Sequence, residues 1–267
     1  MADFEAVKRK QQQTWALGDF GMIGWNTVYP GELLCEALAL RAGERVLDVA
    51  TGSGNAALSA ARRNCEATGI DYVPSLIERA RERAAAEKLP AHFEVGDCEQ
   101  IPFADASFDV VLSVFGSMFA PDADKAAQEL MRVCRSGGRI GLANWTPDGF
   151  WGQAFGLVGR YVPAPAGVRP AVEWGTEQRL AELFGAQTTS TRVVRRSALF
   201  RFRSSAHWIE VFSRYFGPII RVRETLDAQR NQEFLNELDV LLNRFNTSAD
   251  GTLVLAADYL EVAMTRR

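Results

Sequence analysis

The chain has 267 residues, of which 47% are hydrophobic and 24% charged, and its formal net charge at pH 7 is −3. These values are typical of a globular protein and show none of the basic excess expected of a nucleic-acid-binding protein. Four cysteines without a Cys-x-x-Cys pair predict reduced thiols, a cytoplasmic location and no metal site. The charged start, 1–15, and the shortness of the most apolar stretch, 108–120, predict neither a secretory signal nor a membrane span.

Residues 1–40 differ in their residue pattern from the rest of the chain, and this pattern predicts a helical cap with a flap. Helices are expected over 4–16 and 33–40. Between them, 18–25 carries three glycines among aromatic side chains, which is typical of a mobile segment that closes over a ligand. Permanent packing, with the glycines in tight turns, is the alternative. The candidates for a substrate pocket here are Phe20, Trp25 and Tyr29.

The segment 45–57 is the most informative part of the chain. Its apolar run predicts a buried strand interrupted by Asp48, its glycines predict a tight turn, and 55–63 predicts a helix. Such a turn lets a cofactor approach the backbone closely. Gly-x-Gly also opens dinucleotide sites. However, Ala57 stands where such a site usually keeps a third glycine, and Asp48 would repel a pyrophosphate while suiting a cationic ligand.

From 45 to 145 the pattern alternates between strands and helices, which implies a parallel sheet with helices on both faces. Ser75 to Glu78 predicts a capping box for a helix that runs to about Lys88. Asp122 is expected to cap a helix that ends before Gly137. Ligands bind at the carboxyl ends of such strands. The residues expected there are Gly52, Asp71, Asp97 and Ser113.

Beyond 145 the alternation fades and the pattern predicts a helical roof. About fifty residues separate the last two predicted strands, far more than a usual connection. We therefore interpret 204–250 as a helical insertion that roofs the active site together with 1–40 and 146–176. The expected elements are a helix over 150–161, a loop over 162–170, a helix over 177–184, a strand over 188–202, helices over 204–245 broken at Gly217-Pro218, and a strand over 251–265.

Five motifs follow one another in order along the chain: 45–57, 67–71, 93–98, 107–113 and 130–140. Together they resemble the class I S-adenosylmethionine-dependent methyltransferases, in particular the ubiquinone/menaquinone-biosynthesis (methyltransferase type 11) group. The resemblance implies an α/β fold: a Rossmann-like seven-stranded, mostly parallel sheet with an antiparallel last strand and helical lid insertions. It implies one methyltransferase domain, 1–267, with a cap at 1–40, a cofactor-binding core at 41–145, lid insertions at 146–176 and 204–250, and a strand hairpin at 187–203 and 251–265.

The resemblance also implies which residues bind S-adenosyl-L-methionine. Asp71 would bind both ribose hydroxyls and Asp97 would accept from the adenine amine, with helix or turn capping as the alternative for each. Asp48 would tune the glycine loop, unless it is a buried structural acid. Tyr72 and Leu76 would flank adenine or pack in the core. The other expected cofactor contacts are Ala50, Thr51, Gly52, Gly54, Cys98, Ser113, Val114 and Phe115, and Phe119 and Trp145 are expected on the substrate side.

The implied activity is methyl transfer to a small-molecule acceptor by in-line displacement, which needs neither a metal nor an oxyanion hole. The catalytic residue is unknown. His207 is the candidate general base, because its ordinary pKa lies near neutrality, and a plain surface role is the alternative. His92 is expected to be structural. The following aromatic residues line a substrate chamber or pack the roof, and packing is the prediction for most of them: Trp145, Trp151, Trp174, Phe212, Tyr215 and Phe216.

Two other functions fit parts of the pattern. A nicotinamide-dependent oxidoreductase would use Asp71 equally well, but it is disfavoured by Asp48 and Ala57. A non-catalytic S-adenosylmethionine-binding regulatory protein would keep the same cofactor motifs. The partners expected are a small-molecule substrate and a second copy of the chain in a homodimer, with no nucleic acid.

Overall fold

The structure is a computed structural model that describes residues 3–267. It contains a seven-stranded sheet in the order β3-β2-β1-β4-β5-β7-β6. The first five strands pair in parallel, and β7 lies antiparallel between β5 and β6. The predicted sheet is therefore confirmed. The strands are β1 (Arg45–Val49), β2 (Glu66–Asp71), β3 (Ala91–Val95), β4 (Phe108–Val114), β5 (Cys134–Trp145), β6 (Thr188–Phe202) and β7 (Leu253–Arg266).

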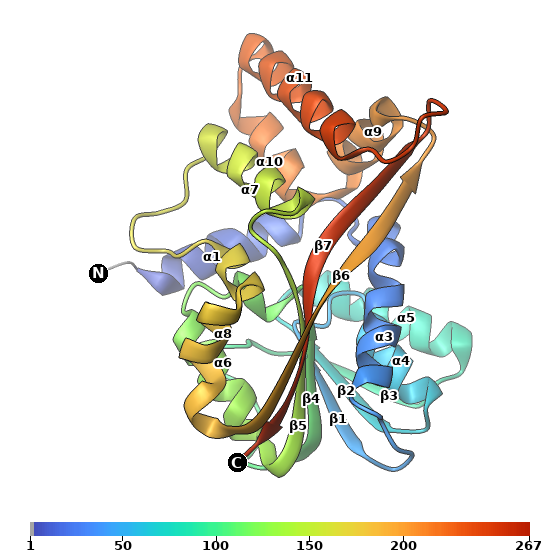
Figure 1. Cartoon of the computed structure of the whole chain (residues 1–267), viewed down its shortest axis with the longest axis vertical. Helices are drawn as coiled ribbons and strands as arrows, with labels where there is room; N and C mark the ends of the chain where they lie inside the picture. The colour runs from blue at the N-terminus through green and yellow to red at the C-terminus, as the bar shows by residue number, and fades with distance from the viewer. Residues whose placement is uncertain (1–2) are drawn as a thin grey trace.

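Helices cover both faces of the sheet (Figure 1), with α3, α4 and α5 on one side and α6 and α8 on the other. The central parallel strands are apolar and buried on both faces, as such sheets require. The helices of the core are α3 (Val28–Ala37), α4 (Asn55–Arg62), α5 (Pro74–Glu87), α6 (Ala123–Val133) and α8 (Glu177–Phe184), and the short 3₁₀ turns are η1 (Trp25–Thr27), η2 (Ser117–Phe119), η3 (Ala171–Gly175) and η4 (Gly185–Gln187).

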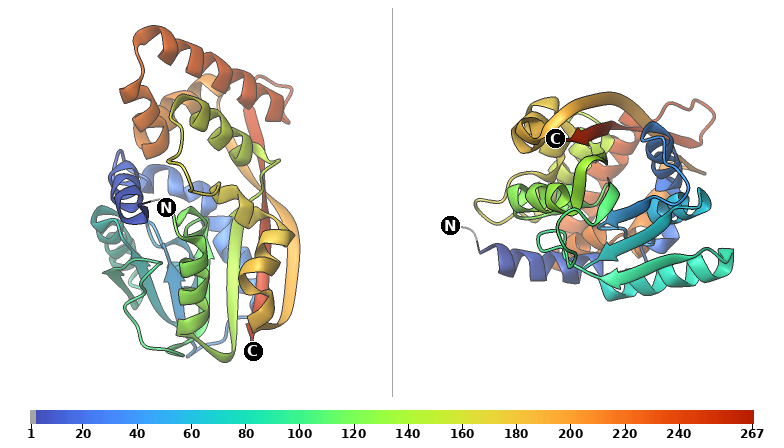
Figure 2. Two further views of the ribbon diagram at one scale, coloured as in Figure 1. Left: turned by 90° about the vertical axis from the view of Figure 1, so that its left-hand side faces the viewer. Right: turned by 90° about the horizontal axis from the view of Figure 1, so that it is seen from below.

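The remaining helices lie beyond one end of the sheet as a cap and a lid, and the long β6–β7 hairpin extends to meet the lid (Figures 1 and 2). Figure 2 shows α1 between this lid and the strands. The predicted insertion is present, because α9 to α11 lie between β6 and β7 in the chain. The helices of the cap and lid are α1 (Phe4–Trp15), α2 (Gly21–Gly24), α7 (Phe150–Tyr161), α9 (Ser205–Tyr215), α10 (Gly217–Thr225) and α11 (Ala228–Phe245).

Capping chemistry sets several of these boundaries. Asp122 accepts a hydrogen bond from the backbone N–H of Lys125 at 3.0 Å, so the predicted cap of α6 is confirmed. The predicted capping box at Ser75 is wrong. Instead, α5 begins at Pro74, whose fixed φ suits the first helical turn, and Val73 makes no side-chain cap.

Three other local predictions need correction. The helix expected over 33–40 begins earlier and ends earlier, as α3. The roof helices break at Gly217-Pro218 as predicted and a second time before Ala228, where Asp227 caps α11 by accepting from Arg230 N. The expected flap over 18–25 is largely helical, as α2 and the start of η1. Its mobility remains a prediction.

Candidate functional site

A cavity lies at the carboxyl ends of β1, β2, β4 and β5, between the sheet, α1 and the lid. Its volume is about 1240 Å³, counting the part open to solvent. Its lining divides into an ionisable half and an aromatic half, which are described in turn.

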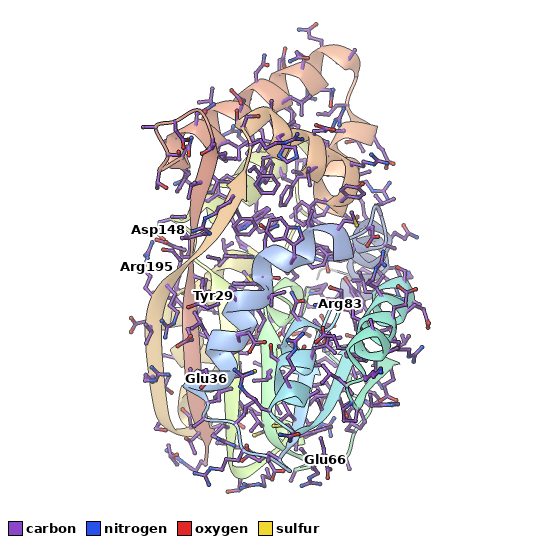
Figure 3. The ribbon with its side chains drawn as sticks, turned by 90° about the vertical axis from the view of Figure 1, so that its right-hand side faces the viewer. Tyr29, Glu36, Glu66, Arg83, Asp148 and Arg195 are labelled. Carbon is purple, nitrogen blue, oxygen red and sulfur yellow. The ribbon has the colours of Figure 1, made fainter. Side chains whose placement is uncertain are left out.

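The loop after β1 forms the floor of the ionisable half. Asp48 is buried and accepts hydrogen bonds from Thr51 Oγ1 at 2.6 Å and from Ala57 N at 2.9 Å, so its carboxylate fixes the loop. Burial raises the pKa of Asp48 to about 7, against the lowering effect of these two hydrogen bonds. From α5, Arg83, labelled in Figure 3, donates to Asn55 Oδ1 at 2.7 Å. The loop is therefore held from both sides.

Asp71 lies at the end of β2, with 5% of its surface exposed. Its two oxygens accept one backbone hydrogen bond each, from Gly52 N and from Val73 N, both at 2.9 Å. Burial raises the pKa of Asp71 to about 6, and the two backbone donors partly oppose this rise. Each oxygen keeps lone-pair capacity for a further donor, which is what recognition of a diol requires.

Asp97 is joined to α1 by an ion pair that the sequence did not reveal. Lys8 Nζ lies 2.7 Å from Asp97 Oδ2 and 2.8 Å from the buried Glu99 Oε2. Burial would lower the pKa of Lys8, but the hydrogen bonds that its ammonium donates to these two carboxylates outweigh this effect and raise the pKa above its usual range. Gln12 Nε2 also donates to the carbonyl of Tyr72. Helix α1 therefore closes this end of the cavity.

The end of β4 crosses the loop after β1 at close range. A Cβ on Gly116 would lie 2.6 Å from the carbonyl oxygen of Ala50, so this approach requires glycine. Ala50 and Phe115 both have φ of +54°, an uncommon conformation for residues with a side chain. Strained backbone of this kind gathers at ligand sites. Neither position is itself a glycine or an asparagine, so the residue type gave no sign of this conformation in the sequence.

The aromatic half is built from β5, β6 and the lid. Phe115 stacks on Trp145 with ring centroids 3.6 Å apart and an interplanar angle of 3°. Two helical pairs at i, i+4 spacing, Trp151 with Phe155 and Phe212 with Phe216, add four more rings. The lining of this half contains no ionisable side chain. The rings that line it are Trp15, Phe20, Phe115, Phe119, Trp145, Trp151, Phe155, Phe200, Phe212 and Phe216.

Most of the residues singled out in the sequence meet in this cavity. The expected cofactor contacts that line it are Asp48, Ala50, Thr51, Gly52, Asp71, Tyr72, Leu76, Asp97, Cys98, Val114 and Phe115, and the expected substrate contacts are Phe20, Phe119 and Trp145. Lining residues that sequence reasoning missed include Lys8, Gln11 and Trp15 of α1. Their spacing places them on one helix face, which was the available signal.

Five expected contacts do not line the cavity. Ser113 is buried in β4, and its hydroxyl donates a hydrogen bond to Val49 O of β1 at 2.8 Å. Gly54 packs against the ring of Phe93. Trp25 and Tyr29 are 55% and 67% exposed, and Figure 3 shows Tyr29 on α3. His207 begins α9, where its Nδ1 accepts from the backbone N–H of Arg203 at 3.3 Å. These five residues therefore lie outside the cavity lining, and a role for them in binding or catalysis stays a prediction.

The other packing expectations have mixed outcomes. Trp145, Trp151, Phe212 and Phe216 both pack in the core and line the cavity, whereas Trp174 and Tyr215 do not line it. His92 is exposed and lies 3.5 Å from Glu94, away from the cavity. Within 3–267, no group of three or more His, Cys, Asp or Glu side chains is placed to hold a metal ion. No helix of these residues is long and apolar enough to cross a membrane.

Comparison with known proteins places this site in context. Residues 46–138 match the family model described as a methyltransferase domain. An uncharacterised protein of Mycobacterium tuberculosis is 38% identical over 225 residues, which cover 83% of this chain and 82% of that protein. A demethylmenaquinone methyltransferase of Deinococcus radiodurans is 36% identical over 143 residues, 52% of this chain and 57% of its own. The crystal structure of the YcgJ protein from Bacillus subtilis superposes with a TM-score of 0.63 at 21% identity, covering 90% of this chain and 99% of that one.

Proposed function

This chain belongs to the class I S-adenosylmethionine-dependent methyltransferases, and we propose that it methylates a small molecule held in the aromatic half of its cavity. The observation that supports the proposal is the division of the cavity into the ionisable half and the aromatic half, which has no ionisable side chain. A relative named for a small-molecule acceptor, demethylmenaquinone, supports the same acceptor class.

The ionisable half fits a cationic adenosyl ligand. Asp71 would accept from the ribose hydroxyls, because it lines the cavity and each of its oxygens has only one protein donor. Asp97 would accept from the adenine amine. Gln11 Oε1, which is buried and accepts from no atom of the described chain, offers a second acceptor at this end. The buried acids favour a sulfonium and oppose a pyrophosphate, which argues against a nicotinamide cofactor.

When bound, S-adenosylmethionine supplies a methyl group that passes by in-line displacement to an acceptor lone pair, while sulfur keeps the electrons of the broken bond and any acceptor proton passes to water. The protein's own part is alignment and exclusion of water. Phe115, at the junction of the two halves, and the lid rings would hold the acceptor against the donor. His207 lies outside the lining, so the proposal assigns no general base.

The rival within the same fold is a cofactor-binding regulatory protein without turnover. The aromatic half favours catalysis, because a regulator that senses the cofactor alone has no need of a second, ring-lined compartment. A nucleic-acid acceptor is disfavoured by the net charge of −3. Homodimer formation and a cytoplasmic location remain predictions.

Calorimetry with the purified chain tests the cofactor. S-adenosylmethionine and S-adenosylhomocysteine are expected to bind and NAD is not. Transfer of a labelled methyl group to a small-molecule extract then tests turnover. Absence of binding by both adenosyl ligands would refute the proposal, and binding without any transfer would favour the regulatory rival.

A further inference from the structure

One ammonium group in the ionisable half serves several carboxylates, including the expected adenine acceptor. Lys8 Nζ lies 2.7 Å from Asp97 Oδ2, 2.8 Å from Glu99 Oε2 and 3.2 Å from Glu5 Oε1. An ammonium has three donors, so each of them has a carboxylate within reach. Lys8 lines the cavity but keeps no donor for a ligand. Its effect on a bound cofactor would therefore pass through these acids.

The backbone holds both cavity-lining acids in place beside Lys8. Asp97 Oδ1 accepts a hydrogen bond from the backbone N–H of Glu99 at 2.9 Å. Glu99 Oε1 accepts from the backbone N–H of Asp122, at the start of α6, at 2.8 Å. Because Glu99 is only 2% exposed, water does little to screen its charge. Lys8 is therefore the shared counter-ion of two carboxylates that are fixed close to each other.

Without the ammonium, these two carboxylates would repel each other. One oxygen of each lies within hydrogen-bond distance of the same nitrogen atom, which brings the acids within the range of strong like-charge repulsion. The neighbouring titratable side chains of the lining, Asp71, Tyr72 and Cys98, carry no positive charge that could replace Lys8. Two carboxylates in such a position share one proton.

That proton changes what Asp97 can recognise. An ionised carboxylate only accepts hydrogen bonds, whereas a protonated one also donates. The amine of adenine is a donor and matches the ionised form. The carbonyl oxygen that replaces this amine in hypoxanthine is an acceptor, so it would face the lone pairs of Asp97 with no proton between them.

We propose that Lys8 is a positioning residue for purine recognition: by balancing the charge of Glu99, it keeps Asp97 an acceptor only, so that the site selects the adenine amine over a carbonyl. This proposal rests on the proposed function, in which Asp97 accepts from the adenine amine. It extends that function to two residues that do not bind the purine themselves. Lys8 sets the protonation state of Asp97, and Glu99 makes the cation necessary.

The test compares S-adenosylhomocysteine with its deaminated analogue, S-inosylhomocysteine, which carries a carbonyl oxygen in place of the amine. Calorimetry on the full-length protein gives both affinities, and their ratio is the measured quantity. The wild-type protein should prefer S-adenosylhomocysteine by about 10- to 150-fold, the range for one hydrogen bond to a charged group. Lys8→Met should reduce the ratio several-fold, toward the range of about 2- to 12-fold for a neutral hydrogen bond.

A double substitution restores the charge balance without restoring the ammonium. In Lys8→Met/Glu99→Gln, the second carboxylate is removed together with the cation, so Asp97 has no acid neighbour with which to share a proton. The introduced amide oxygen can still accept from the backbone N–H of Asp122. The ratio of the two affinities should therefore return to the wild-type value.

Arg179→Met is the matched control. Arg179 is also a buried cation shared by two acids, with its guanidinium 3.3 Å from Asp124 and 3.0 Å from Glu182, but it does not line this cavity. Its replacement should lower the melting temperature and leave both affinities unchanged. A loss of stability by itself therefore does not imitate the expected effect of Lys8→Met.

The outcomes separate this proposal from the proposed function. Failure of S-adenosylhomocysteine to bind the wild-type protein contradicts the methyltransferase proposal itself. Normal binding of that ligand without preference over S-inosylhomocysteine overturns the role of Lys8 alone. An unchanged ratio in folded Lys8→Met protein also overturns it, because Lys8 then supports only the fold. Should Lys8→Met fail to fold, the double variant decides: a wild-type ratio supports the charge-balance argument and a reduced ratio overturns it.

Discussion

Replacing Asp71 by Asn removes a charge from the centre of the cofactor half while keeping the shape of the side chain. The wild-type carboxylate accepts from Gly52 N and Val73 N and is free to accept from ligand hydroxyls. The amide keeps one acceptor oxygen and presents a donor where the second stood. Because a hydrogen bond to a charged group contributes about 1.5–3 kcal/mol, we expect S-adenosylhomocysteine affinity to fall about 10- to 150-fold.

Calorimetry measures this loss, and thermal unfolding checks the fold of the variant. The matched control is Asp109→Asn. Asp109 also accepts a backbone hydrogen bond, from Arg45 N at 2.8 Å, and another from Arg135 Nε at 2.7 Å, but it lies outside the cavity. The control should lower stability without changing affinity. Wild-type affinity in a folded Asp71→Asn protein, or an equal loss in both variants, would refute the assigned role.

Other predictions follow from pKa, charge pairing and backbone space. Burial raises the pKa of Asp71 in the free protein to about 6, so protons compete with the cofactor for this carboxylate. The affinity for S-adenosylhomocysteine should therefore fall as the pH drops from 8 to 5. An affinity that calorimetry finds independent of pH would contradict this prediction. With no ligand, the same shift makes the free energy of unfolding decrease as pH rises from 3.8 through about 6, because the folded state holds the proton longer. Lys8→Met should destabilise the protein by about 3 kcal/mol, because it leaves the buried Glu99 without its cation. Chemical denaturation measures this loss, and an unchanged denaturation midpoint would count against the ion pair. Gly159→Ala, in open space on α7, should stabilise the protein by about 0.5–1 kcal/mol. Gly217→Ala should destabilise it, because the new Cβ would lie 1.9 Å from a carbonyl oxygen of α1. Melting temperatures that shift in the same direction for both variants would refute this argument.

Much of the sheet was predictable because its signals are local. Strand β6, expected over 188–202, was predicted with its observed boundaries because its residues are rich in Thr, Val and Phe and turn signals flank them. Asp71 and Asp97 could be placed at the same edge of the sheet because parallel strands end together. The order of the sequence motifs predicted most of the other residues that line the ionisable half.

The unpredicted parts depend on contacts between distant segments. Lys8 pairs with an acid 89 residues further along the chain, and no local pattern records that distance. Ala50 and Phe115 adopt positive φ because two loops cross there, not because their own side chains prefer it. Trp151 and Phe212 are apolar at helical spacing, a pattern that is the same for a ring packed in a core and for a ring that lines a cavity.

In the proposed reaction, the confinement of ionisable groups to one half of the cavity would also favour catalysis. During methyl transfer, positive charge leaves sulfur and spreads toward the acceptor. A carboxylate beside the sulfonium would stabilise the starting state at least as well as the transition state, and such uniform stabilisation does not raise the rate. Aromatic faces carry weak, extended negative potential, which suits a charge that spreads over several atoms. In the proposed reaction, the rings from Phe115 to the lid would therefore face the charge as it reaches the acceptor, while Asp71 and Asp97 would hold the cofactor at the other end of the cavity.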